Sequence, residues 1–138
     1  MSRRTARKQA FLSLYQSDIN ESPIDSILKR WRSYRGELDP YAVELTHGVE
    51  RECEELDARL SEVSKGWPVH RMSAVDRSIL RLAVYEILYV DDVPPEVAVN
   101  EAVELATGFS GEDSPVFVGG VLRGVAGRVL GEDKVEHG

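Results

Sequence analysis

The chain has 138 residues, of which 42% are hydrophobic and 30% are charged, and its formal net charge is −7. That length favours one domain with a hydrophobic core, which we take to span residues 1–138. No apolar run approaches the roughly 20 residues of a membrane span, and no leader pattern is present, so we expect a cytoplasmic protein without membrane association.

Apolar residues recur every three or four positions, and no useful stretch shows strand-like alternation, which predicts an all-α fold. The first helix is predicted from about residue 3 to residue 19, with Ser2 as its N-cap. Ser22-Pro23 then combines a cap hydroxyl with proline at the first helical position, and Gly36 marks the end of this second helix.

Asp39-Pro40 repeats the start signal, and the apolar stripe behind it predicts one helix of about 26 residues, roughly 39 Å long, that ends near Val63. Residues 65–68 break the chain. The fourth helix is predicted from about Ser73, with Asp76 as an acid in a capping-box position, and it is apolar nearly all round. This pattern is typical of a central helix.

Residues 91–95 end the fourth helix and begin the fifth, which is predicted to stop at Gly108. Residues 110–115 form a predicted loop and the start of a sixth helix, in which several glycines stand among valines and leucines. From about residue 131 onward the composition predicts a disordered tail.

Charge is distributed unevenly along the chain. The first 17 residues carry a net charge of +4 and contain no acid, whereas the remaining 121 residues carry −11. A solvated, frayed terminus and a local nucleic-acid footprint both fit this pattern. On a helix, Arg7 points in nearly the same direction as Leu14. Because one side chain is charged and the other is apolar, we do not expect both to lie on one buried surface. We therefore predict that the first two turns overhang the bundle as a basic arm, residues 1–8.

Catalytic, cofactor and metal sites find no support in the sequence. His47, His70 and His137 stand far apart, without partners at ligand spacing. The carboxylates fall on predicted helix surfaces rather than in an acid–base pair. Cys53 is the only cysteine, so we expect a buried, inert thiol and no internal disulfide. We expect a protein that is not an enzyme and has no cofactor.

Several runs, taken in order, resemble the NusB family of transcription antitermination factors over about residues 3–129. They are the N-terminal arginines, the Trp67-Pro68 break and the runs 75–87, 94–106 and 117–122. The resemblance implies an all-helical bundle of six to seven helices in two three-helix units. It also implies a non-catalytic protein that binds single-stranded boxA RNA with ribosomal protein S10 (NusE) inside RNA polymerase antitermination complexes.

The resemblance also implies roles for individual residues. Those implied to contact RNA are Arg3, Arg4, Arg7, Lys8, Phe109, Asp113 and Phe117. The cations would contact phosphates, which gives affinity but little sequence reading, and the rings would stack on unpaired bases. Core packing of both rings and a capping role for Asp113 are the alternatives.

Tyr15 and Asp76 match positions implicated in assembly with S10 and RNA, and the alternatives are a core tyrosine and a helix cap. The chain departs from the family at Val116, Gly119 and Arg123, where the family usually has Lys, Asn and Asp. Losing a lysine and an amide beside the implied RNA surface would weaken or retune recognition, and Arg123 would restore a cation from another place.

Two other functions compete with this one. The first is a pure protein-interaction bundle, in the form of a homodimer that masks the arm. The second is a helical domain of the kind found in RNA cytosine methyltransferases, against which the absence of a strand–glycine–helix nucleotide-binding pattern argues.

Overall fold

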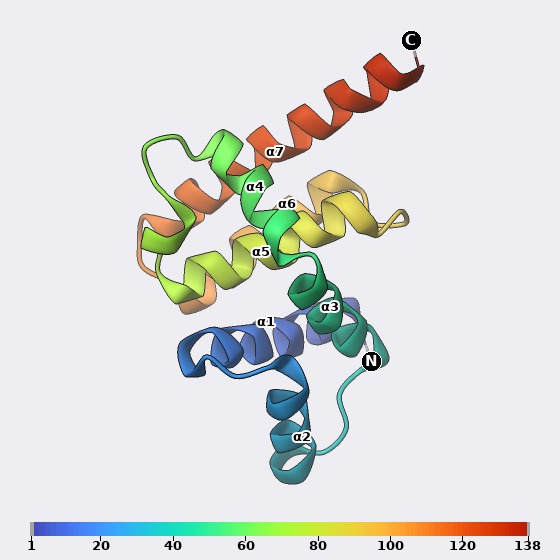
Figure 1. Ribbon diagram of the computed structural model, residues 1–138, viewed down its shortest axis with the longest axis vertical. Helices are drawn as coiled ribbons and strands as arrows, with labels where there is room; N and C mark the ends of the chain where they lie inside the picture. Colours follow the sequence, from blue (N-terminus) through green and yellow to red (C-terminus); the bar gives the residue numbers. More distant parts are fainter. Residues whose placement is uncertain (1, 138) are drawn as a thin grey trace.

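The computed structural model describes the backbone of residues 2–137 and the side chains of residues 2–131. This part of the chain contains seven α-helices, one short 3₁₀ helix and no strand, which confirms the predicted all-α fold (Figure 1). In chain order they are α1 (Arg3–Asn20), α2 (Ile24–Arg35), α3 (Pro40–Arg51), α4 (Cys53–Val63), η1 (Val69–Arg71), α5 (Ala74–Tyr89), α6 (Pro95–Phe109) and α7 (Ser114–His137). Over the same residues, no helix combines the length and hydrophobicity that a membrane span requires.

Three predicted helix starts are confirmed by their capping hydrogen bonds. The Ser2 hydroxyl accepts from the backbone N–H of Thr5 at 3.2 Å, and the Ser73 hydroxyl accepts from that of Asp76 at 3.1 Å. The Asp39 carboxylate accepts from the N–H of Tyr41 at 2.8 Å. Each bond satisfies a backbone donor that the first helical turn leaves without a partner.

The predicted Ser22 cap is wrong. Helix α2 begins after Pro23, and the Ser22 hydroxyl donates to the carbonyl of Asn20 at 3.3 Å. The backbone N–H of Ile24 donates instead to the carboxylate of Glu50, 2.9 Å away on α3. A tertiary contact therefore replaces the local cap.

The predicted helix from Pro40 to Val63 is divided in two. The backbone of Glu52 leaves helical geometry, with φ −99° and ψ 14°, so α3 ends at Arg51 and α4 begins at Cys53. The Glu52 carboxylate accepts a hydrogen bond from the Tyr89 hydroxyl of α5 at 3.2 Å. The break lets α3 pack on α1 while α4 packs on α5 and α7.

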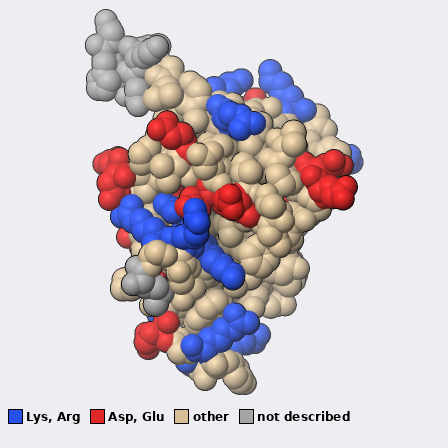
Figure 2. Space-filling model, turned by 180° about the vertical axis from the view of Figure 1, so that it is seen from behind, with Lys and Arg blue, Asp and Glu red and all other residues tan. Residues whose placement is uncertain are grey.

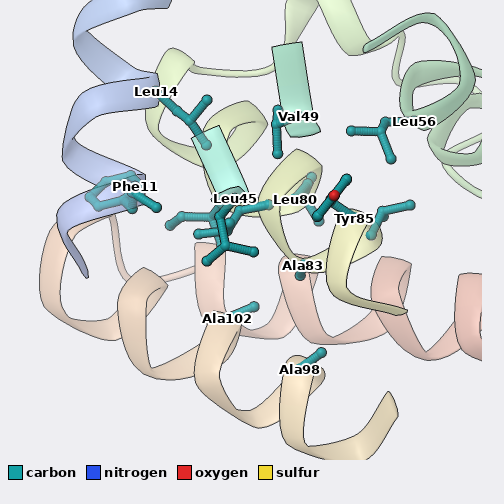
Figure 3. Close-up of a cluster of buried hydrophobic side chains, with 14 of the residues drawn as sticks. Phe11, Leu14, Leu45, Val49, Leu56, Leu80, Ala83, Tyr85, Ala98 and Ala102 are labelled. Carbon is teal, nitrogen blue, oxygen red and sulfur yellow. The ribbon is translucent and has the colours of Figure 1, made fainter. Parts of the chain in front are cut away.

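Helices α1, α2 and α3 form one half of the molecule, and α4 to α7 form the other (Figure 1). The first half has the three helices expected, whereas the second has four because the long helix is divided. Helix α5 lies between the halves and contacts α1, α3, α4, α6 and α7. Phe11 and Leu14 of α1 meet Leu45 of α3 and Leu80 of α5 in a shared core (Figure 3).

Helix α7 is the longest helix and extends beyond the bundle (Figure 1). The predicted disordered tail covers residues 131–138, and the side chains of residues 132–138 lie outside the described part of the structure. The tail therefore stays a prediction.

Candidate nucleic-acid interface

Arg7, predicted to extend into water, is buried in the structure. It is 6% exposed, and its Nε lies 2.8 and 3.0 Å from the two carboxylate oxygens of Glu86. The Tyr41 hydroxyl donates to the same carboxylate at 2.5 Å, and Nη1 of Arg7 lies 3.6 Å from Glu101. The prediction that Arg7 and Leu14 do not share a buried surface is wrong, because Glu86 neutralises the guanidinium in place.

The electrostatics of this buried cluster keep the Arg7 guanidinium charged and the Tyr41 hydroxyl neutral. Burial, the largest single influence, would lower the pKa of Arg7, but the hydrogen bond to Glu86 and the nearby charges of Glu86 and Glu101 together outweigh it, and the pKa is raised. Burial, together with the bond to Glu86, raises the pKa of Tyr41 far above its usual value. The cluster joins α1, α3 and α5, so Arg7 holds the first turns of α1 on the bundle rather than presenting a free cation.

Arg3 and Arg4 lie on the surface beside acids of the other half. Both terminal nitrogens of Arg3 donate to Asp92, at 3.2 and 3.1 Å, and its guanidinium carbon lies 4.4 Å from the centre of the Tyr41 ring. Nε of Arg4 lies 3.3 Å from Glu101. Figure 2 shows blue side chains near the start of α1 directly beside red ones.

These two surface pairs are weak. The hydrogen bond from Arg3 lowers the pKa of Asp92, so the carboxylate is charged at neutral pH. Water and dissolved salt screen ion pairs at the surface, so such pairs add little to stability. A phosphate group therefore competes with the two carboxylates at little cost.

Lys8 and Phe109 form the most open part of this surface. The ammonium of Lys8 lies 5.8 Å from the centre of the Phe109 ring, within the range of a cation–π contact. Among the residues with described side chains, Lys8 has no carboxylate partner. The Phe109 ring is 41% exposed, while its inner side packs on Phe11 with the ring centres 5.1 Å apart. A hollow of about 430 Å³, lined in part by Arg4, lies beside both.

The loop that follows Phe109 is tied to α5 through Asp76. The Asp76 carboxylate accepts from the hydroxyls of Ser110 and Ser114, at 2.8 and 3.1 Å, and the two hydroxyl oxygens lie 2.8 Å apart. Asp76 therefore fixes the start of α7 instead of returning to cap its own helix. Asp113 lies exposed in this loop.

Phe117 and Tyr15 are both partly buried against the core. Tyr15 lies on α1, with its ring centre 6.4 Å from that of Phe11. Phe117 lines a second hollow together with Asp113, Trp67 and other residues. The predicted residues thus fall in two places, one beside Phe109 and one beside Phe117.

Trp67 and Arg71 are absent from the predicted site residues. The sequence pattern around Trp67 indicates only a break between helices, yet both side chains line the hollow with Phe117. The sequence did carry a signal for them. An aromatic residue and an arginine stand four positions apart in a segment that lies outside the apolar stripe of any predicted helix.

The three departures from the family pattern lie on α7. Val116 is highly exposed. At Gly119, a Cβ atom would lie 3.1 Å from a terminal nitrogen of Arg123, so the Arg123 guanidinium lies against the glycine. The departures at Gly119 and Arg123 are therefore neighbours in space, because the glycine leaves room for the arginine side chain.

Solved structures similar to this chain share its whole architecture. T. maritima NusB matches with a TM-score of 0.82 and 32% identity, over 91% of each chain. A structure of the antitermination factors NusB and NusE in complex with dsRNA matches with a TM-score of 0.82 and 26% identity, over 91% of this chain and 96% of that one. The fold and these similarities define a helical transcription antitermination factor, a class without catalytic activity.

The sequence comparisons identify the family. The pattern of the NusB family matches residues 4–127. The transcription antitermination protein NusB of Rubrobacter xylanophilus is 68% identical over 132 residues, which cover 96% of this chain and 95% of that protein. The chain belongs to the NusB family, as the resemblance implied.

Proposed function

We propose that this chain binds a single-stranded boxA-type RNA together with ribosomal protein S10 (NusE), as a part of a cytoplasmic RNA polymerase antitermination complex. The observation that carries the proposal is the Lys8 ammonium, without a carboxylate partner among the described side chains, beside the half-exposed Phe109 ring, in a chain whose net charge is −7. A cation and an open aromatic face on one surface suit a phosphate and its base. The similar solved complex of NusB and NusE with dsRNA supports NusE and RNA as partners.

Each predicted residue takes a role that fits its place. Arg3, Arg4 and Lys8 contact phosphates, the first two after release from Asp92 and Glu101. Phe109 stacks on a base. Arg7 acts indirectly, because its buried pair with Glu86 fixes the turn of helix that carries the other cations.

The remaining residues act at the loop and at the partner surface. Asp113 and Phe117 contact RNA where α7 begins. Asp76 holds that loop through Ser110 and so shapes the RNA surface. Tyr15, which is partly exposed on α1, contributes to the contact with S10.

The alanine variant of Arg3, Arg4 and Lys8 tests the phosphate contacts. Helicity and melting temperature should stay nearly unchanged, because all three side chains are exposed. RNA affinity should fall, and the slope of log K against log salt should shrink by about 0.7 for each lost contact, at most about 2 units. Fluorescence anisotropy of a labelled boxA-type strand, measured over a series of salt concentrations, gives the slope.

A matched control removes three exposed cations from α2. The alanine variant of Lys29, Arg30 and Arg32 changes the net charge equally, far from Phe109 in the sequence. For this control variant, the slope of log K against log salt should stay close to that of the wild type. Equal losses in both variants would mean that net charge, and not the surface at α1, governs binding. Light scattering on the same samples reports whether self-association covers the start of α1.

A further inference from the structure

We propose that the hollow between the η1 segment and the start of α7 is a second nucleotide-binding site. One unpaired base stacks against Trp67 and Phe117, and its phosphate pairs with Arg71. This inference rests on the proposed function, and it extends the bound strand beyond the surface at Phe109.

The walls of the hollow suit a flat ring. Its volume is about 660 Å³, and Trp67 and Phe117 line it from segments 50 residues apart in the chain. Trp67 is 52% exposed although it is the largest kind of side chain. Aromatic rings that stay open to water at a hollow are typical of sites that stack on unpaired bases.

The cation of the hollow is free. Within the residues whose side chains are described, Arg71 has no carboxylate in ion-pair distance. The next two arginines of the chain differ, because Arg77 pairs with Asp18 at 2.6 Å and Arg81 pairs with Asp57 at 2.8 Å. Asp76 and Asp113 also line the hollow, but no ion pair joins either of them to Arg71 among the described residues. The guanidinium therefore keeps its donors for an anionic, aromatic ligand.

The segment that carries Trp67 and Arg71 is held in place before any ligand binds. Nη1 of Arg77 donates to the carbonyls of Val69 and Met72, at 3.3 and 2.9 Å, and both of these side chains are buried. Arg77 thus anchors the residues on each side of Arg71. A preorganised site loses less conformational entropy when it binds.

The exposed carboxylate of Asp113 favours a ligand that has hydrogen-bond donors as well as a negative charge. Asp113 lines the same hollow, where it would repel an acidic chain but accept hydrogen bonds from the amino group of a base. The loop between α6 and α7 connects the hollow to the first surface. Ser110 follows Phe109 directly, and the shared bonds to Asp76 join it to Ser114, three residues before Phe117.

The test uses the full chain and truncations of a boxA-type strand from about 4 to 16 nucleotides, the range of site sizes for single-strand binding. Wild-type affinity should rise with length until both surfaces are covered. Trp67→Ala should lower the affinity for long strands by about tenfold, with the salt slope unchanged, and leave the shortest strands unaffected. Arg71→Gln should reduce the slope by about 0.7 on long strands alone.

Conservative variants and surface controls exclude a loss of structure. Trp67→Phe and Arg71→Lys should keep most of the affinity, and Tyr34→Ala and Arg30→Gln, both at exposed positions on α2, should change nothing. Circular dichroism checks folding.

Three results would overturn the proposal. If Trp67→Ala and Arg71→Gln bind every length like wild type while the Arg3, Arg4 and Lys8 variant is weakened, this site fails and the proposed function stands. Loss of S10 binding with intact RNA binding would make the hollow a protein surface. Failure of wild type to bind any strand, with or without S10, would remove both proposals.

Discussion

Replacing Arg7 by alanine should lower the free energy of unfolding by about 3–5 kcal/mol, because it leaves a buried carboxylate without its partner. Glu86 is 1% exposed, and Arg7 is its only cationic partner among the described residues. At the size of this chain the loss corresponds to a fall in melting temperature of roughly 10–20 °C. Thermal and urea unfolding, followed by circular dichroism, measure it.

Two further variants separate the buried pair from a general effect of charge. Arg4→Ala removes an exposed arginine from the same helix and should cost less than about 1 kcal/mol. Arg7→Met combined with Glu86→Leu and Tyr41→Phe should recover most of the stability, because no charge or hydroxyl is left unpaired. An Arg7→Ala protein as stable as Arg4→Ala would contradict the role given to the pair.

Replacing Gly48 by alanine should destabilise the protein by about 1–3 kcal/mol, the usual range for overpacking a core. Helix α3 crosses α5 here, and a Cβ at position 48 would overlap the ring of Tyr85. Tyr85 is 5% exposed and packs on Tyr89 with ring centres 5.2 Å apart, so the ring has little room to move. Urea unfolding gives the change in free energy.

Gly120→Ala is the matched control, because it adds the same methyl group inside a helix where nothing lies within 4 Å. It should stabilise the protein by up to about 1 kcal/mol. Tyr85→Leu should cost less in the Gly48→Ala background than in wild type, since the smaller side chain relieves the overlap. A Gly48→Ala protein that gains stability like Gly120→Ala would show that α3 and α5 are not so closely packed.

Local signals in the sequence predicted most of the fold. The starts at Ser2, Asp39 and Ser73 depend on a side chain and a backbone N–H no more than three residues apart, so the pattern alone is sufficient. The division of the long helix at Glu52 could not be predicted, because the apolar stripe continues through it. The Tyr89 contact there comes from 37 residues away.

The candidate site was predicted in part, and distance along the chain again explains the difference. Phe109 fits both of its predicted interpretations, since one side of the ring packs on the core and the other faces water. The burial of Arg7 depends on Glu86, 79 residues away, which no local pattern reveals. Trp67 and Arg71 gain meaning only when Phe117 is brought beside them.

The most direct measurement is the affinity of the full chain for a boxA-type strand, with and without ribosomal protein S10, at several salt concentrations. We expect RNA binding that strengthens when S10 is added and falls steeply as salt rises, because phosphate contacts release counterions. Binding that ignores both S10 and salt would contradict the proposal that the cations at the start of α1 hold the strand.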